Sequence, residues 1–390
     1  MRKQNYRLLL GCAAALAAAA PAGAAKDSIV DYAKSFVAQV TQPVTAWTGP
    51  TTGPRAVKDK LIVYVSTDQR NGGARGVGQG AAQAAKAIGW QLRIIDGQGT
   101  ISGQTSAMAQ AIALHPDGII LGGVDALQEA PEVAEAERHG IAVVGWHAGP
   151  TPGPMTSPKV FANITTNPLE VAKAAALYAV AESDGHAGAV IFTDSAYKIA
   201  IEKSDAIAAW LKKCAGCKIL AVENTPLADV ANRMPQLTTS LLERFGARWT
   251  YSLGINDLYF DFIAPSLQSA GIPGGGPPVD SSAGDGSASA FQRIRTDQYQ
   301  AATVAEPLNL QGWECIDELN RAFNHVPWSG YVPPVHLFTS ANIDRDGGPQ
   351  NLFDPENNYE AIYTKIWTGV TGSRHAAVRA ARSSAQASRL

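Results

Sequence analysis

The chain has 390 residues, of which 46% are hydrophobic and 17% are charged, and its formal net charge is −2. A faintly acidic surface offers nothing to the phosphate backbone of a nucleic acid, so we exclude nucleic-acid binding. The length is too great for one compact core and suits two lobes.

The first 24 residues have the pattern of a cleavable export signal. Three basic residues precede an alanine-rich apolar stretch from Leu8 to Ala20, and Ala22–Ala24 supplies the small residues that a signal peptidase requires. The apolar stretch is too short to span a bilayer, and no later stretch qualifies. We expect the mature protein to begin at Ala25 and to reside in the periplasm. The segment Leu9–Cys12 leaves a lipoprotein signal as an alternative.

Two flanking segments differ from the rest of the chain. Apolar residues recur at helical spacing from Lys26 to Val40, whereas the following residues 41–55 are rich in Pro, Gly and Thr. Residues 25–56 are therefore predicted to form an N-terminal helix and an extended arm. Residues 371–390 consist largely of Ala, Arg and Ser without an aromatic residue, which predicts a disordered tail.

From residue 57 onward one unit recurs: a short apolar strand, a loop of small and polar residues, and a helix. The predicted strands are Leu61–Val65, Leu92–Ile95, Gly118–Leu121, Ala142–Gly145, Val160–Ile164, Ala189–Phe192, Ile219–Val222, Trp249–Leu253 and Ala301–Ala305. The predicted helices are Gly80–Ile88, Gly103–Leu114, Ala126–His139, Leu169–Ala181, Tyr197–Lys213, Ala228–Phe245, Asp257–Ala270 and Leu310–Phe323. This alternation predicts an α/β protein with two doubly wound parallel sheets.

A glycine-rich segment imitates a dinucleotide-binding site. Gly76–Ala81 matches G-x-G-x-x-A, and Asp96 ends the next strand. That site requires its first glycine directly after the strand, but the strand ends near Ser66, ten residues earlier. We therefore place these glycines in a helix that packs closely on the sheet and expect no nucleotide cofactor. The chain also lacks a G-x-S-x-G nucleophile motif, so we predict a binding protein without catalytic residues.

Three cysteines follow the export signal. Cys214 and Cys217 end a predicted helix, and in an oxidising compartment this spacing favours a local disulfide. A redox pair or half of a zinc site is the alternative, but no second cysteine pair completes a metal site. Cys315 lies in an amphipathic segment and is predicted to be a buried small hydrophobe.

Polar side chains follow the predicted strands, where parallel sheets bind ligands. Carboxylates and amides bind hydroxyl groups, and an indole covers an apolar ring face, so the set suits a neutral polyhydroxylated ligand. For any single Asp or Asn, capping of the next helix is the alternative, and Asp257 fits it especially well. The candidate ligand-binding residues are Asp68, Arg70, Asn71, Asp125, Trp146, His147, Asp194, Tyr197, Asn256, Asp285 and Glu306.

Several short segments occur in an order that is similar to a known family. They are Leu61–Asp68, Pro116–Ile120 with Asp125, Gly140–Val144, Ile255–Asp257, Ala283–Gly286 and Ala302–Glu306. Over about residues 58–367 the chain resembles the ribose/galactose-binding (type I) periplasmic binding proteins that feed ABC importers. The resemblance implies two Rossmann-like lobes joined by a three-segment hinge near residues 165, 306 and 337. It assigns residues 57–165 and 307–336 to lobe I, and 166–306 and 337–370 to lobe II.

The resemblance also implies a function and a pocket. Asp125, Asn256, Asp285 and Glu306 match pocket positions of the family. The implied protein is a monomer that captures a sugar or polyol by hinge closure and delivers it to a membrane permease of an ABC importer. Ligand delivery to a chemoreceptor or sensor kinase, or a non-sugar cyclic or aromatic ligand, remains an alternative.

Two departures bear on the ligand. The loop Arg70–Ala74 lacks the stacking aromatics that family members often place after the first strand. Trp146 and His147 stand where the family usually carries Asp-Arg, so we expect Trp146 to take over the stacking role. A pocket with glycines on one wall accepts a bulkier or less hydroxylated ligand than ribose.

Overall fold

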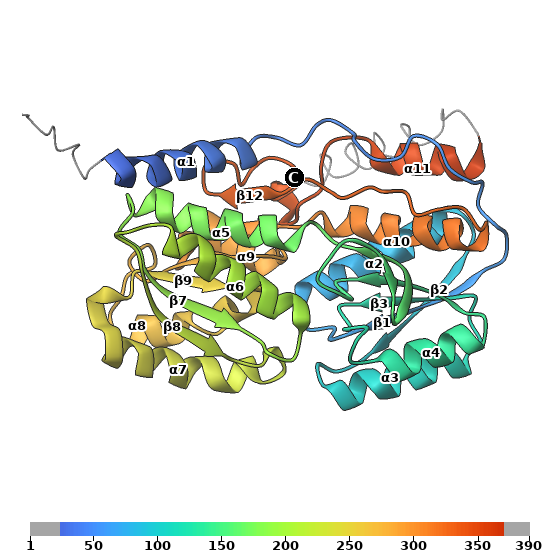
Figure 1. Cartoon of the computed structure of the whole chain (residues 1–390), viewed down its shortest axis with the longest axis horizontal. Helices are drawn as coiled ribbons and strands as arrows, with labels where there is room; N and C mark the ends of the chain where they lie inside the picture. Colours follow the sequence, from blue (N-terminus) through green and yellow to red (C-terminus); the bar gives the residue numbers. More distant parts are fainter. Residues whose placement is uncertain (1–23, 370–390) are drawn as a thin grey trace, which may run out of the picture.

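The computed structural model describes residues 24–369, and these form two α/β lobes that lie side by side (Figure 1). The predicted disordered tail and residues 1–23 of the predicted export signal lie outside the described residues. Each lobe contains one six-stranded, mostly parallel sheet flanked by helices. The predicted fold class is therefore confirmed.

Lobe I contains the first sheet, with strand order β2-β1-β3-β4-β6-β5. Its strands are β1 (Leu61–Ser66), β2 (Gln91–Asp96), β3 (Gly118–Gly122), β4 (Ala142–Trp146), β5 (Gly153–Thr156) and β6 (Lys159–Ile164). Its helices are α2 (Gly72–Ala87), α3 (Ile101–Ala113), α4 (Ala130–Arg138) and α10 (Leu308–Phe323). One face of the sheet is covered by α2 and α10 and the other by α3 and α4.

The glycine-rich segment lies inside α2, as expected. This helix begins at Gly72, earlier than predicted, because the Asn71 side chain caps it by accepting hydrogen bonds from the Gly73 and Ala74 amides. The glycines let α2 and α10 approach closely: a Cβ atom at Gly80 would meet the backbone of Asn309. Close helix packing, rather than phosphate binding, explains the motif.

Lobe II contains the second sheet, with strand order β12-β11-β10-β9-β7-β8. Its strands are β7 (Gly188–Thr193), β8 (Lys218–Asn224), β9 (Tyr251–Gly254), β10 (Val279–Ser282), β11 (Gln300–Ala305) and β12 (His336–Thr339). Its helices are α5 (Pro168–Glu182), α6 (Lys198–Lys212), α7 (Val230–Phe245), α8 (Ala264–Ser269) and α9 (Ala288–Arg295). The single helix predicted for 257–270 is instead a 3-10 turn, Asp257–Asp261, followed by α8 with Pro265 in its first turn.

Three connections join the lobes near the predicted positions: β6 to α5, β11 to α10, and α10 to β12. Two further segments run over the side of the molecule on which α5 and α10 lie (Figure 1). Helix α1 (Ala24–Val40) packs on α5 of lobe II, and residues 41–57 then cross to lobe I. There the Val57 amide donates to Asn320 of α10 at 3.1 Å.

The C-terminal part of the described chain departs from the assignment of residues 337–370 to lobe II. Strand β12 joins the second sheet, but α11 (Tyr359–Thr368) packs on α10 of lobe I. The cause is aromatic packing, since the ring centroid of Trp313 in α10 lies 5.4 Å from that of Trp367 and 6.5 Å from that of Tyr363.

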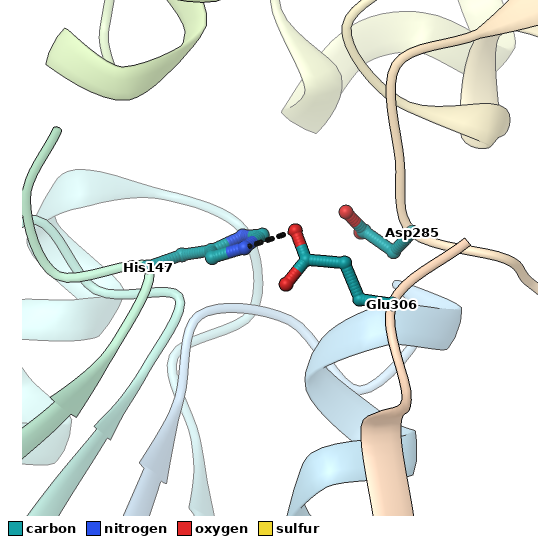
Figure 2. Close-up of side chains that lie close together, drawn as sticks. All are labelled: His147, Asp285 and Glu306. Atoms are coloured by element: carbon teal, nitrogen blue, oxygen red, sulfur yellow. Dashed lines mark hydrogen bonds and ion pairs between the residues drawn. The ribbon is translucent and has the colours of Figure 1, made fainter. Parts of the chain in front are cut away.

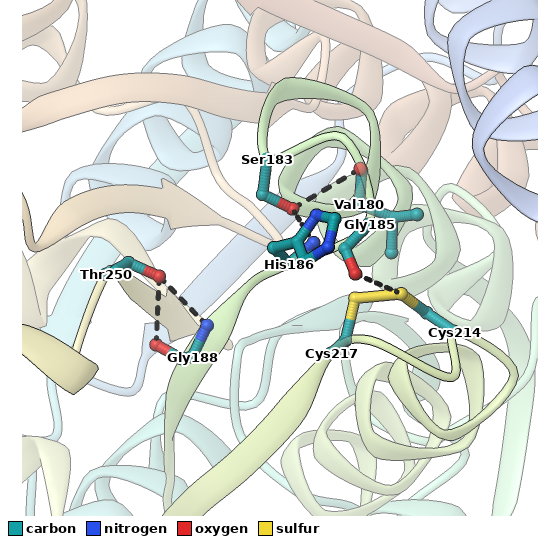
Figure 3. The surroundings of a disulfide bond; sticks show 8 residues. All are labelled: Val180, Ser183, Gly185, His186, Gly188, Cys214, Cys217 and Thr250. Carbon is teal, nitrogen blue, oxygen red and sulfur yellow. Dashed lines mark hydrogen bonds between the residues drawn. A yellow bond between two sulfur atoms is a disulfide. The ribbon is translucent and has the colours of Figure 1, made fainter. Parts of the chain in front are cut away.

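The loop between α6 and β8 contains a disulfide (Figure 3). The Cα atoms of Cys214 and Cys217 lie 5.3 Å apart, within the usual range for such a bond. Cys315 is a free thiol that is buried in α10.

Candidate functional site

A cavity of about 60 Å³ lies between the lobes, at the carboxyl ends of the strands. Seven of the eleven candidate ligand-binding residues line it: Asp68, Asn71, Trp146, His147, Tyr197, Asn256 and Asp285. Apolar side chains complete its wall, among them Ile199, Leu227, Ile255 and Leu258. The cavity thus combines polar groups from both lobes with an apolar surface from lobe II.

A stacked pair of rings forms the wall at the end of β4. The Trp146 and His147 ring centroids lie 4.0 Å apart with the planes inclined by 12°. The Trp146 indole is fixed from behind, because Nε1 donates to Gln311 Oε1 at 2.8 Å. His147 has a φ of 52°, so the chain turns sharply directly after the strand. Both rings are therefore held rigidly in place.

Glu306, which does not line the cavity, holds His147 through a hydrogen bond (Figure 2). Its Oε1 lies 2.8 Å from His147 Nε2, and its Oε2 accepts hydrogen bonds from Gln311 and from the Thr166 amide. Burial alone would raise the pKa of Glu306, but the charge and hydrogen bond of His147 and the charge of Lys203 lower this pKa to about 2. Glu306 is thus an ionised acceptor that orients His147.

Asp285 provides a buried carboxylate from lobe II. Asn256 Nδ2 donates to Asp285 Oδ2 at 2.7 Å, which ties together the two polar groups that follow β9 and β10. Burial raises the pKa of Asp285, and the charges of His147 and Lys203 oppose this rise. Across the cleft, a Cβ atom at Gly73 would collide with the carboxylate. The start of α2 therefore fits closely against Asp285.

The structure adds a cavity residue that the sequence analysis missed. Lys203 of α6 is only 3% exposed, lines the cavity and donates through Nζ to the Ala283 carbonyl at 2.8 Å. A signal for it exists in the sequence, because Ile199, Lys203 and Ile207 are spaced four residues apart and share one face of the helix. A lysine on the apolar face of a buried helix is unusual and indicates a specific partner.

Hydrogen bonds between the lobes hold the cavity closed. The Tyr197 hydroxyl of lobe II lies 3.2 Å from Thr67 Oγ1 and 3.1 Å from Gln104 Nε2 of lobe I. The Lys198 amide of lobe II donates to Asp125 Oδ2 at 3.2 Å. The lobes therefore stand in a closed arrangement, with the cavity walled by both.

The family follows from comparison with known proteins. Residues 62–325 match the model of the periplasmic binding protein domain. The chain belongs to the periplasmic binding protein family. No helix in residues 24–369 of this binding protein has the length and hydropathy needed to cross a membrane. A search of curated protein sequences finds no significant match.

Solved structures share the fold of this binding protein at low sequence identity. A sugar ABC transporter protein from Yersinia enterocolitica has a TM-score of 0.67 and 15% identity, covering 83% of this chain and 100% of that one. An ABC transporter solute-binding protein from Agrobacterium vitis, bound with α-D-tagatopyranose, has a TM-score of 0.65 and 15% identity, covering 75% of this chain and 99% of that one. A solute-binding protein from Bacillus halodurans, with bound myo-inositol, has a TM-score of 0.62 and 14% identity, covering 75% of this chain and 98% of that one.

Four candidate residues of the binding protein lie outside the cavity lining. Arg70 is largely exposed and forms an ion pair with Asp68, with Nη2 and Oδ2 2.8 Å apart. Asp125 accepts hydrogen bonds from the Leu127 and Gln128 amides, and Asp194 from the Ala196 and Leu227 amides. Glu306, the fourth, is hydrogen-bonded to His147. Neither carboxylate caps the helix that follows it, since α4 and α6 start without a side-chain cap, and Asp125 also accepts the interlobe bond from the Lys198 amide.

Asp257, which fitted a simple capping role, has a different environment. It is buried, and its Oδ2 accepts hydrogen bonds from the Gly286 and Ser287 amides while Oδ1 accepts one from Gln300. These bonds hold the loop that carries Asp285 in place.

The trio of His147, Asp285 and Glu306 also has the composition of a metal site. Their ligating atoms lie within 4.8 Å of one another. However, both oxygens of Glu306 are already hydrogen-bonded, and the Lys203 ammonium supplies positive charge beside the same carboxylates. The donor set therefore fits an ion-pair network better than a metal ion.

Proposed function

We propose that this binding protein captures a small neutral polar ligand, a sugar or polyol, in the interlobe cavity and delivers it to an ABC permease in the inner membrane. The observation that carries the proposal is a closed interlobe cavity walled by hydroxyl-binding groups and a fixed indole. Sugar- and polyol-bound structural neighbours support the ligand class.

Charge balance around the cavity favours a neutral ligand. The buried carboxyl groups of Asp285 and Glu306 lie beside the Lys203 ammonium and the His147 imidazole, and Asp68 is paired with Arg70. A charged ligand would leave an uncompensated charge inside a closed cleft, which costs several kcal/mol. Hydroxyl groups, by contrast, can donate to Asp285 and accept from Lys203 without changing the balance.

Ligand entry requires the lobes to separate. The cavity is about 60 Å³ in the closed arrangement, and its polar lining residues Asp68, Asn256 and Asp285 are at most 8% exposed. We therefore propose that an open form admits the ligand and that closure presents both lobes to the permease.

A ligand screen tests the proposal. Thermal unfolding of the protein would be recorded with tagatose, allitol and myo-inositol, and with galacturonate and benzoate as charged probes. We expect at least one neutral polyol at 100 times its Kd to stabilise the fold by about 2.7 kcal/mol, seen as a higher Tm. A rise in Tm with benzoate alone would indicate that the natural ligand is an aromatic acid and not a sugar.

The interlobe hydrogen bonds make a second test. Tyr197→Phe removes the hydroxyl that meets Thr67 and Gln104, and each lost bond costs about 1 kcal/mol of closure. We expect a larger radius of gyration by small-angle scattering in the ligand-free protein. Gln104→Leu, at a residue outside the cavity lining, removes the bond to Tyr197 but leaves the Tyr197–Thr67 bond, so it should give a smaller expansion. Unchanged radii in both variants would contradict this account of closure.

Export belongs to the same proposal. We propose that the signal is cleaved before Ala25 and that the mature protein acts in the periplasm as a monomer. N-terminal sequencing of the periplasmic protein tests the cleavage, and a start at Cys12 would indicate the lipoprotein alternative instead.

A further inference from the structure

The two walls of the interlobe cavity differ in chemistry. Lobe I supplies the Trp146 ring together with polar side chains such as Asp68 and Asn71. Six apolar side chains line the cavity from lobe II: Ile199, Ala200, Leu227, Ala228, Ile255 and Leu258. A ligand that is polar on every side would bury hydroxyl groups against these side chains without hydrogen-bond partners, which costs free energy. The lining therefore favours a ligand with one apolar side.

The apolar wall is built from three segments that are tied together. Ile199 lies in the first turn of α6, Leu227 begins the 3-10 turn that follows β8, and Leu258 lies in the 3-10 turn that follows β9. The Asp194 carboxylate accepts hydrogen bonds from the Leu227 amide and from an amide of the loop before α6. A hydrogen bond of 3.0 Å from the Tyr259 hydroxyl to a backbone carbonyl before Leu227 joins the third segment to the second. The wall is thus a fixed part of lobe II.

Polar groups of lobe II meet the cavity one helical turn farther along α6. Lys203 follows Ile199 by four residues, which is about 6 Å along the helix axis. A Cβ atom at Gly284 would lie 3.0 Å from Lys203 Nζ. The next residue is Asp285, which is hydrogen-bonded to Asn256 at 2.7 Å, so these polar groups form one cluster. The wall of lobe II is therefore apolar near Ile199 and polar near Lys203.

The Lys203 ammonium has donors to spare. Its side chain is buried, with 3% of its surface exposed, and it lines the cavity. Among residues 24–369 its Nζ has one hydrogen-bond partner, the Ala283 carbonyl at 2.8 Å. Because an ammonium carries three N–H groups, two remain for oxygen atoms in the cavity. The polar end of the cavity therefore requires a ligand with several oxygens.

We propose that the ligand is a 6-deoxyhexose, a sugar with a methyl group where a hexose has a hydroxymethyl group. The methyl group lies against Ile199 and Leu227, where its burial stabilises the complex. The ring and hydroxyl oxygens meet the cluster of Lys203, Asn256 and Asp285. A wholly apolar or aromatic ligand would leave these polar groups without partners. This inference rests on the proposed capture of a neutral sugar and names the chemical class of that sugar.

Calorimetry with matched pairs of sugars tests the proposal. The full mature chain would be titrated with L-rhamnose against L-mannose, L-fucose against L-galactose, and D-fucose against D-galactose. The two members of each pair differ only in the methyl or hydroxymethyl group. In the pair that binds, we expect the 6-deoxy sugar to bind about tenfold more tightly, because the additional hydroxyl of its partner is buried against an apolar wall.

Variants of the apolar wall locate the methyl group. Ile199→Thr adds a hydroxyl that can bond the hydroxymethyl group, so the tenfold preference should fall to about twofold or less. Ile199→Val shortens the side chain without adding a hydroxyl and should keep most of the preference. Val222→Thr is the matched control, since Val222 is 53% exposed on β8 and does not line the cavity. It should change the affinity for neither sugar.

A variant of the polar end gives the opposite pattern. Lys203→Met removes the ammonium but keeps an unbranched side chain. It should weaken both members of the pair alike, by at least about tenfold, because both sugars carry the oxygens that Lys203 binds. The preference for the 6-deoxy sugar should persist.

The failure of this inference differs from the failure of the proposed function. If tagatose, allitol, myo-inositol or a hexose binds, but no 6-deoxy sugar binds more tightly than its partner, the sugar-binding function stands and the inference is overturned. An unchanged preference in Ile199→Thr would overturn the placement of the methyl group. If no sugar or polyol of the series binds, the proposed function is wrong and the inference is overturned with it.

Discussion

Replacing Glu306 with glutamine is expected to destabilise the protein by about 3 kcal/mol at pH 7. The pKa of Glu306 is about 2 in the folded protein against a usual value of 4.5, and each unit of difference is worth about 1.4 kcal/mol. Because the folded pKa is the lower one, this stability is complete above about pH 4.5 and is lost as the pH falls toward 2. Glutamine cannot carry the charge that His147 and Lys203 require.

Urea unfolding at pH 7 and at pH 3 measures this effect. The natural protein should lose stability between these two pH values, and the Glu306→Gln variant should lose less because it has no carboxylate to protonate. Glu314→Gln is the matched control, since it removes a second buried glutamate, from α10 of lobe I, whose pKa is raised rather than lowered. The control should be as stable as the natural protein or more so at pH 7. Equal stability of the Glu306→Gln variant and the natural protein at pH 7 would contradict the ion-pair network.

The sequence predicts where several side chains of the site lie but not which groups they contact. Strand ends can be read from apolar runs followed by small residues, so the positions of Asp68 and Trp146 at one edge of the sheets were predictable, whereas Asp285 was found through the family resemblance. The partners of these side chains were not predictable, because they come from distant segments. Gln311 and Thr166 reach Glu306 only after both lobes have folded.

Elements that break the hydrophobic pattern were missed for a related reason. Strand β10 carries Asp280, Ser281 and Ser282, all fully buried, and a polar segment gives no strand signal. The residues of α11 were assigned to lobe II instead of lobe I, because the place of this helix depends on the stacking of Trp367 on Trp313 rather than on chain order. Tertiary packing overrode the local pattern in both cases.

Replacing Asp285 with asparagine is expected to weaken ligand binding by about 10- to 100-fold without loss of stability. A hydrogen bond to a carboxylate contributes about 1.5–3 kcal/mol, against about 0.5–1.5 kcal/mol for one to a neutral amide, so the loss over two hydroxyl contacts is about 2 kcal/mol. The variant keeps the acceptor for Asn256, and burial already disfavours the charged form, because it raises the pKa of Asp285 in the folded protein. Affinity measured by calorimetry should therefore fall while the Tm stays level or rises.

Asp280→Asn separates ligand contact from simple relief of a buried charge. Asp280 is also fully buried in lobe II, but it does not line the cavity, and burial raises its pKa to about 8. Since the folded pKa is raised, stability is lost as the pH climbs from about 4 toward 8, and asparagine should remove this loss. Asp280→Asn should therefore raise the Tm at pH 7 and leave ligand affinity unchanged. If Asp285→Asn changes affinity no more than Asp280→Asn does, Asp285 is a buried acid of the fold and the ligand must be held by other groups of the cavity.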